Sequence, residues 1–160
     1  ADMAAFAAEK LKPGGCLAAY SGQSHLPDVI QSLTNHLDYI WTIAVRGRGP
    51  KTQTCQPRIW SAWKPIFLFA KPPVLRTEWL DDLFEGTGPE KDAHGWQQGL
   101  GEAEHFIRLL SEPGDIVVDP FLGGGTTAVA CRNTGRRFIG AEIDAAAYGQ
   151  TMERLKNGKA

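Results

Sequence analysis

Three consecutive glycines, Gly123-Gly124-Gly125, are the part of the sequence best suited to ligand chemistry. A β-branched run, residues 116–118, and the acid Asp119 precede them, and Thr126-Thr127 follow directly. Glycines let the backbone turn tightly and let a ligand approach its amide groups closely. A glycine loop that opens a helix can hold the polar part of a nucleotide-like ligand. The order therefore predicts a fully buried parallel strand, a ligand-binding loop and a helix that Thr126 or Thr127 caps.

A second acid, Glu142, ends another apolar run, residues 138–141, and follows Gly123 by 19 positions (142 − 123). A carboxylate at the end of such a strand accepts hydrogen bonds from ribose hydroxyls. Gly123, Gly125 and Ala128 also satisfy the relaxed Gly-x-Gly-x-x-Ala pattern of dinucleotide-binding proteins. Strand, glycines, helix, strand and acid together predict an adenosine-binding unit over residues 115–144.

Two segments connect this unit with a known family. Residues 119–127 read Asp-Pro-Phe-Leu-Gly-Gly-Gly-Thr-Thr, and residues 140–144 read Gly-Ala-Glu-Ile-Asp. They resemble the cofactor motifs of the S-adenosylmethionine-dependent DNA amino-methyltransferases, Asp-Pro-Phe-x-Gly-x-Gly-Thr-Thr and Gly-x-Glu-x-Asp. The resemblance extends over nearly the whole chain, in the order of the subgroup whose catalytic segment precedes its cofactor segment. It implies an α/β fold: a Rossmann-like methyltransferase sheet with helices on both faces.

The resemblance also implies roles for individual residues toward S-adenosylmethionine. Asp119 and the glycine loop would meet the methionine part, Glu142 would hold the ribose, and Asp144 would lie near the adenine. The segment 94–98, His-Gly-Trp-Gln-Gln, loosely resembles a motif that lines the same pocket. The implied cofactor-binding residues are Asp119, Phe121, Gly123, Gly125, Thr126, Thr127, Glu142, Asp144 and Gln97.

The catalytic segment of that family does not occur in the 160 residues. It resembles Asp-Pro-Pro-Tyr, with Asn or Ser as replacements for the Asp, and it holds the exocyclic amine of a flipped adenine or cytosine. Lys71-Pro72-Pro73-Val74 is no substitute, because it has a cation where an acceptor is needed and no aromatic side chain. We therefore name no catalytic residue, expect no activity from the isolated chain, and leave adenine N6 and cytosine N4 open as targets.

The missing segment has a structural consequence as well. In the family fold its strand is central, between the strands expected at residues 16–20 and 116–119. Without it the sheet would have unpaired edges, which recruit other strands. We expect self-association or a complementing chain. The sequence also opens inside a helical pattern, so we expect an upstream segment, with residues 1–160 forming one methyltransferase domain incomplete at its N-terminus.

Double-stranded DNA is the partner that the resemblance implies for the complete domain. A basic loop, residues 46–58, contains no acid and could contact phosphates, although a solvated surface loop explains its composition equally well. Just after it, Trp60 and Trp63 could stack on a base, but packing in the core or as a lid is the favoured interpretation. The candidate phosphate contacts are Arg46, Arg48, Lys51 and Arg58.

Composition narrows the class of protein further. A net charge of −1 argues against a histone-like basic protein, and 42% hydrophobic residues indicate a globular chain rather than a disordered one. Cys16, Cys55 and Cys131 are far apart and odd in number, so neither a disulfide framework nor a zinc site follows. A reducing cytoplasm is the simplest setting. No apolar run reaches the roughly 18 residues of a membrane span.

The remaining pattern supplies the elements that must position the site. We expect helices over residues 2–11, after a cap at Ser24, from Leu100 to residue 110, and from Asp144 to about residue 157. Strands are expected at 16–20, 38–46 and in the second part of 59–70. Helices and strands in this alternation indicate an α/β sheet. Two other functions stay open: a dinucleotide-dependent oxidoreductase, and a non-catalytic subunit with a degenerate cofactor pocket.

Overall fold

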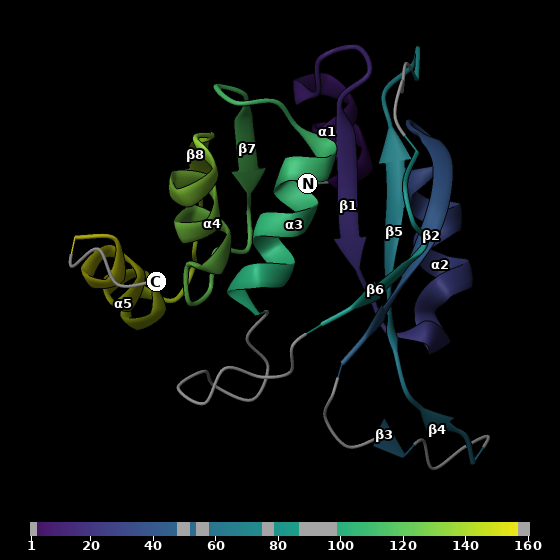
Figure 1. Ribbon diagram of the computed structural model, residues 1–160. Coiled ribbons are helices and arrows are strands. Elements are labelled where there is room, and N and C mark those ends of the chain that lie inside the picture. The colour runs from purple at the N-terminus through teal and green to yellow at the C-terminus, as the bar shows by residue number, and fades with distance from the viewer. Residues whose placement is uncertain (1–2, 48–51, 54–57, 75–78, 87–98, 157–160) are drawn as a thin grey trace. The chain divides into compact units, whose positions relative to one another are not determined.

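The computed structural model describes residues 3–47, 52–53, 58–74, 79–86 and 99–156 (Figure 1). Contacts divide the chain into two units, Ala1–Glu85 and Gly86–Ala160. Helices and strands alternate throughout the second unit, whereas in the first unit five strands follow one another after the second α-helix. Both units contain helices and strands, in agreement with the expected α/β class. Among the described residues, no helix is both long and apolar enough to cross a membrane.

The first unit is built around β5 (Lys64–Ala70), six of whose seven residues are buried. It pairs antiparallel with β1 (Cys16–Tyr20) on one side and with β2 (Asp38–Arg46) on the other. The short β6 (Leu83–Glu85) then pairs parallel with β2, which gives the order β1-β5-β2-β6. Continuous burial of the apolar β5 agrees with its central place. A small hairpin, β3 (Thr52–Gln53) with β4 (Trp60–Ser61), completes the strands of this unit's described part.

Two helices provide the core of the first unit. Phe67 and Phe69 of β5 are fully buried among α1 (Met3–Lys10) and α2 (Leu26–Leu33), with which Leu37 also packs. The cap expected at Ser24 is wrong, because Ser24 lies inside a 3₁₀ turn, η1 (Gln23–His25). The helix α2 begins after this turn, with a proline in its first turn, where the fixed backbone angle of proline suits a helix start.

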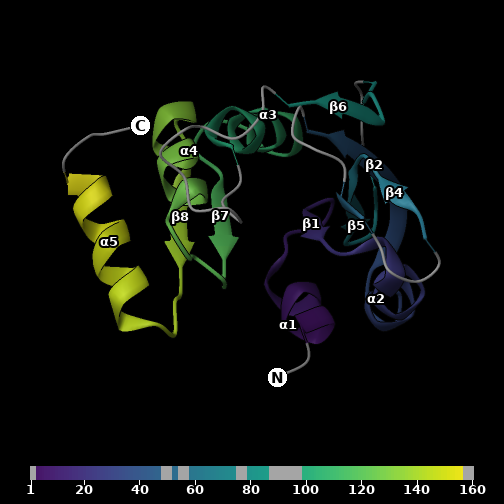
Figure 2. The same cartoon turned by 90° about the horizontal axis from the view of Figure 1, so that it is seen from below.

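The second unit contains a parallel pair, β7 (Ile116–Asp119) and β8 (Arg137–Gly140). Figure 2 shows α3 (Leu100–Leu110) and α4 (Thr126–Thr134) on one side of this pair, with α5 (Ala145–Lys156) at the β8 end. Val117 and Phe138, which are register partners, pack against an apolar cluster that α3 and α4 form. Cys131 is fully buried in that cluster, and burial raises the pKa of its thiol to about 11. The thiol is therefore protonated and inert at neutral pH.

The strand at 116–119 is not fully buried, contrary to expectation. Ile116 and Val118 are 47% and 45% exposed, and Ile139 of β8 is 57% exposed. Successive strand residues point to opposite faces, and α3 and α4 cover only the face that carries Val117 and Phe138. The exposed apolar side chains of Ile116, Val118 and Ile139 lie on the other face of the β7–β8 pair, which nothing in the described part of the chain covers.

The expectation that Trp60 packs in the core is also wrong, because its side chain is 62% exposed. Trp63 is 40% exposed. The strand β4 that carries Trp60 is two residues long and pairs only with β3 in the described structure, so it has no layer to pack against.

The strands β1 and β7 are among those that lie at sheet edges. Within the described residues, β1 pairs with β5 alone, and β7 pairs with β8 alone. Each therefore presents one row of backbone groups without a neighbouring strand. A central strand that would occupy these edges stays a prediction.

The packing of β5 predicts a large stability effect for Phe67→Ala. Emptying a fully buried phenylalanine site should lower the free energy of unfolding by about 3–5 kcal/mol. Urea unfolding followed by circular dichroism measures the change. The control Trp79→Ala removes a fully exposed ring and should change stability by less than about 0.5 kcal/mol. Equal effects of both substitutions would contradict the assignment of β5 as the core strand.

Candidate functional site

The glycine loop is a tight turn between β7 and α4. As the chain leaves β7, Oδ1 of Asp119 accepts a hydrogen bond from the N–H of Phe121, at 3.0 Å. The N–H of Gly125 then donates to the carbonyl of Leu122, at 2.9 Å. Gly123 and Gly125 have φ angles of 49° and 76°, which only glycine adopts without strain.

The expected threonine cap of α4 is wrong. The N-cap is Gly125, in the left-handed conformation, and no side chain makes a capping bond there. Thr126 and Thr127 are instead the first two helical residues. The turn must end on a positive φ, and this requirement places glycine where a capping side chain would otherwise sit.

Glu142 holds the loop from the end of β8. Its Oε2 accepts the N–H of Gly123 at 2.7 Å, and its Oε1 accepts the N–H of Asp144 at 2.9 Å. These backbone donors, first that of Asp144 and then that of Gly123, hold the pKa of Glu142 below its usual range. Because the pKa is lowered, the hold on the loop is fully present above the ordinary value of 4.5 and is lost as pH falls through the folded-state pKa.

Asp144 begins the helix that follows. Its Oδ1 accepts the N–H of Ala147 at 2.8 Å, and its carbonyl accepts the N–H of Tyr148 at 3.0 Å. The side chain thus satisfies a backbone donor in the first turn of α5. Glu142 and Asp144 consequently fix both the loop and the start of α5.

The helix α5 returns to the glycine loop through two side chains that the sequence did not single out. The hydroxyl of Thr151 donates to the carbonyl of Gly123 at 2.8 Å, and Thr151 is completely buried. The guanidinium of Arg154 donates to the carbonyl of Gly124 at 3.0 Å. Both residues follow the loop by more than 25 positions and form no local motif with it, so sequence pattern alone contains no signal for these contacts.

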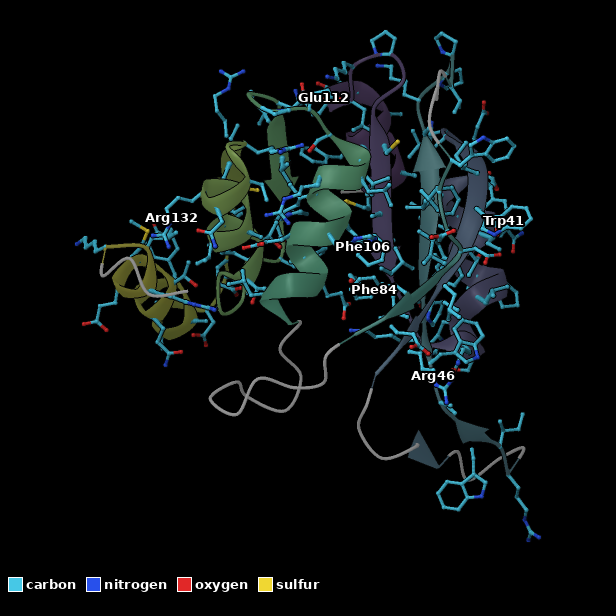
Figure 3. The ribbon with its side chains drawn as sticks, viewed as in Figure 1. Trp41, Arg46, Phe84, Phe106, Glu112 and Arg132 are labelled. Carbon is cyan, nitrogen blue, oxygen red and sulfur yellow. The ribbon has the colours of Figure 1, made fainter. Side chains whose placement is uncertain are left out.

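A second arginine fixes α5 to its neighbour. Arg132 lies on α4, and its guanidinium donates to the carbonyl of Leu155 at 3.0 Å (Figure 3). The Leu155 side chain also packs against the apolar cluster of α3 and α4. The last turns of α5 are thereby attached to the body of the second unit.

Two exposed apolar side chains lie on the segments that the Gly123–Glu142 bond joins. Phe121 is 77% exposed and Ile143 is fully exposed. Thr126 is buried, Gly123 and Thr127 are half-buried, and Gly124 is exposed. Gln97 and the segment 94–98 lie outside the described residues. Nothing in the described part of the chain groups three or more metal-ligating side chains.

The candidate DNA contacts belong to the first unit. Arg46 is exposed and lies 3.6 Å from the carboxylate of Glu85, and Figure 3 shows it at the end of β2. Such an exposed pair contributes at most about 1 kcal/mol. Arg58 is also exposed. Arg48 and Lys51 lie outside the described residues.

The segment that contains the glycine loop and Glu142 is similar to known sequences. Residues 75–153 match the family model for N6/N4 DNA methylases. Over these residues the chain is similar to that DNA methylase family. The matched stretch contains the glycine loop, Glu142 and Thr151.

Curated proteins resemble this chain over short segments. It is 44% identical over 55 residues to a Bacillus subtilis protein named type II methyltransferase M.BglII. It is 48% identical over 42 residues to type II methyltransferase M1.MboII of Moraxella bovis. These segments make up 34% and 26% of this chain but only 15% and 16% of the two relatives.

Solved structures match this chain over nearly its full length. The M1.HpyAVI complex with S-adenosylmethionine has a TM-score of 0.79 at 25% identity, covering 95% of this chain and 79% of that one. The cytosine-N4-specific PvuII methyltransferase has a TM-score of 0.63 at 20% identity, covering 94% and 73%. The chain therefore has the Rossmann-like fold of these methyltransferases.

The site geometry predicts that Gly125→Ala is strongly destabilising. A Cβ at this position would lie 2.5 Å from Cγ2 and 2.8 Å from Oγ1 of Thr151, and φ is 76°. The left-handed conformation alone costs a non-glycine residue about 1–2 kcal/mol, to which the contact adds. Urea unfolding should show a total loss above about 2 kcal/mol.

The matched control is Gly101→Ala. Gly101 is exposed within α3, and nothing lies within 4 Å of an added Cβ. Alanine is the better helix former, so this change should be neutral or stabilise by up to about 1 kcal/mol. If the Gly125→Ala protein were as stable as wild type, Thr151 would not be in close packing contact with Gly125.

Proposed function

We propose that this chain is the S-adenosylmethionine-binding part of an enzyme that methylates an exocyclic amino group of a DNA base. The observation that carries the proposal is the bond between Glu142 and the Gly123 N–H, at 2.7 Å. This bond joins the glycine loop to Glu142, which follows the end of β8. The fold match to a methyltransferase solved with S-adenosylmethionine supports the same assignment.

The residues at this point suit the cofactor chemically. A carboxylate offers about four acceptor positions, so Glu142 can hold Gly123 and Asp144 and still accept ribose hydroxyls. Phe121 and Ile143 offer exposed apolar surface to a flat adenine ring. Asp119 and the exposed Gly124 backbone would face the methionine part. Asp144, Gly125, Thr126 and Thr127 complete the set, and Gln97 is proposed on sequence alone.

When bound, S-adenosylmethionine supplies the methyl group as an electrophile. This chain's contribution is to hold that cofactor, because no segment of residues 1–160 matches the Asp-Pro-Pro-Tyr motif that would hold the acceptor amine. Positioning of donor and acceptor provides much of the rate in such reactions. We propose that the acceptor-holding segment comes from outside these 160 residues, that the isolated chain transfers no methyl group, and that double-stranded DNA is the substrate of the complete domain.

Both units are proposed to belong to one methyltransferase domain, since the solved M1.HpyAVI structure matches 95% of the chain. The edges of β1 and β7 are where a complementing strand, or a second copy of the chain, would pair.

Cofactor binding is tested by Glu142→Gln. Two backbone N–H groups require two acceptors, and glutamine offers one oxygen and no charge. Losing charge-assisted bonds of this kind should lower the affinity for S-adenosylmethionine about 10- to 100-fold, as measured by titration calorimetry. Glu153→Gln, an exposed carboxylate change on α5, should leave the affinity within about twofold.

Nicotinamide dinucleotide is the competing ligand in this experiment. An intact wild-type fold that binds NAD and not S-adenosylmethionine would overturn the proposed function in favour of an oxidoreductase. An unchanged affinity in a folded Glu142→Gln protein would remove Glu142 from the site.

The basic loop is tested by the salt dependence of DNA binding in the complete domain. Each phosphate contact contributes roughly 0.9 to the slope of log affinity against log salt. Replacing the four cations Arg46, Arg48, Lys51 and Arg58 with Gln should therefore flatten that slope by up to about 3.6.

The control for this test replaces the same number of cations outside the loop: Lys10, Lys12, Lys71 and Lys156. It should leave the slope nearly unchanged. A loop variant whose slope equals that of wild type would show that these side chains are only solvated.

A further inference from the structure

One buried hydroxyl contacts the backbone of the glycine loop. Thr151 is completely buried on α5, and its Oγ1 donates to the carbonyl of Gly123 at 2.8 Å. Its Cγ2 also lies against Gly125, where an added Cβ would come within 2.5 Å. The side chain thus combines a directional bond with a close packing contact on neighbouring loop residues.

One turn further along α5, a cation holds the next peptide group. The Arg154 guanidinium donates to the carbonyl of Gly124 at 3.0 Å. Bonds from a charged donor are about twice as strong as neutral ones. The helix that carries both side chains is itself fixed, because Arg132 of α4 donates to the carbonyl of Leu155. Consecutive carbonyls of the loop are therefore held from an anchored helix.

The two bonds determine where the opposite sides of these peptide groups point. A trans peptide is planar, and its C=O and N–H point in opposite directions. Because the carbonyl of Gly123 points to Thr151, the N–H of Gly124 must point away from α5. Gly124 is exposed, so this donor faces the open side of the loop. Meanwhile Glu142 holds the N–H of Gly123 from the other strand.

We propose that Thr151 and Arg154 are positioning residues that fix the glycine loop in its ligand-binding conformation before the ligand arrives. Their effect on affinity rests on the proposed cofactor function, whereas their effect on the loop does not. Pre-ordering removes part of the entropy that binding would otherwise cost. The ligand group that benefits is an acceptor, a carboxylate or hydroxyl oxygen, facing the N–H of Gly124.

The experiment measures amide hydrogen exchange in the ligand-free chain by NMR. The reporters are the hydrogen-bonded amides of Leu122, Gly123 and Gly125. Thr151→Val keeps the shape and removes the hydroxyl, and Thr151→Ser restores a hydroxyl. Arg154→Met removes the guanidinium, and Lys156→Met removes a cation from the same helix without a loop contact in the described structure.

Loss of a net hydrogen bond should speed exchange of the reporter amides about 2- to 12-fold in Thr151→Val and Arg154→Met. Thr151→Ser and Lys156→Met should stay near the wild-type rate. Affinity for S-adenosylmethionine should fall by a similar factor in the first two variants. Amides in α3 and α4 should not change, which separates loop ordering from a general loss of stability.

Unchanged loop exchange in both Thr151→Val and Arg154→Met would overturn the proposal. Equal acceleration in α3, α4 and the loop would overturn it as well, because the two side chains would then only support the fold. If the wild-type chain fails to bind S-adenosylmethionine while the loop amides respond as expected, the positioning role stands and the proposed function fails.

Discussion

The second unit depends on one residue that is held from two sides. The N–H of Gly123 is bound by the Glu142 carboxylate, and its carbonyl is bound by the Thr151 hydroxyl. Three segments that are separate in sequence meet there: the glycine loop, the end of β8 and α5. A positive φ of 49° makes this backbone conformation one that glycine adopts readily. The glycine loop is therefore held in one conformation by its contacts with β8 and α5.

The parallel pair β7–β8 brings these segments together. Its ladder continues past both strands, since the N–H of Ala141 donates to the carbonyl of Asp119 and the N–H of Leu122 donates to that of Ala141. This register sets Gly123 beside Glu142. The apolar contacts of Val117 and Phe138 with α3 and α4 in turn fix the ladder. The packing of Val117 and Phe138 against α3 and α4 thus helps to set the position of the Gly123–Glu142 hydrogen bond at the ends of β7 and β8.

Sequence reasoning succeeded where local pattern decides the structure. The strands Cys16–Tyr20 and Asp38–Arg46 lie at the predicted residues, because β-forming apolar runs and flanking breakers define them locally. It failed where the outcome depends on a distant partner or a second layer. The exposure of Ile116, the cap at Gly125 and the loop contacts of Thr151 are all of this kind. The family motifs located the loop and Glu142, but no pattern indicated that the two bond to each other.

The most direct test is an NMR titration of the isotope-labelled chain with S-adenosylhomocysteine, the demethylated form of the cofactor, which cannot react. Amide shifts should concentrate at residues 119–127 and 142–144, with Gly123 and Gly124 among the most affected. NAD should leave these amides unchanged. Saturating S-adenosylhomocysteine without shifts in this loop, or the same shifts produced by NAD alone, would contradict the assignment of the loop as a methyl-donor site.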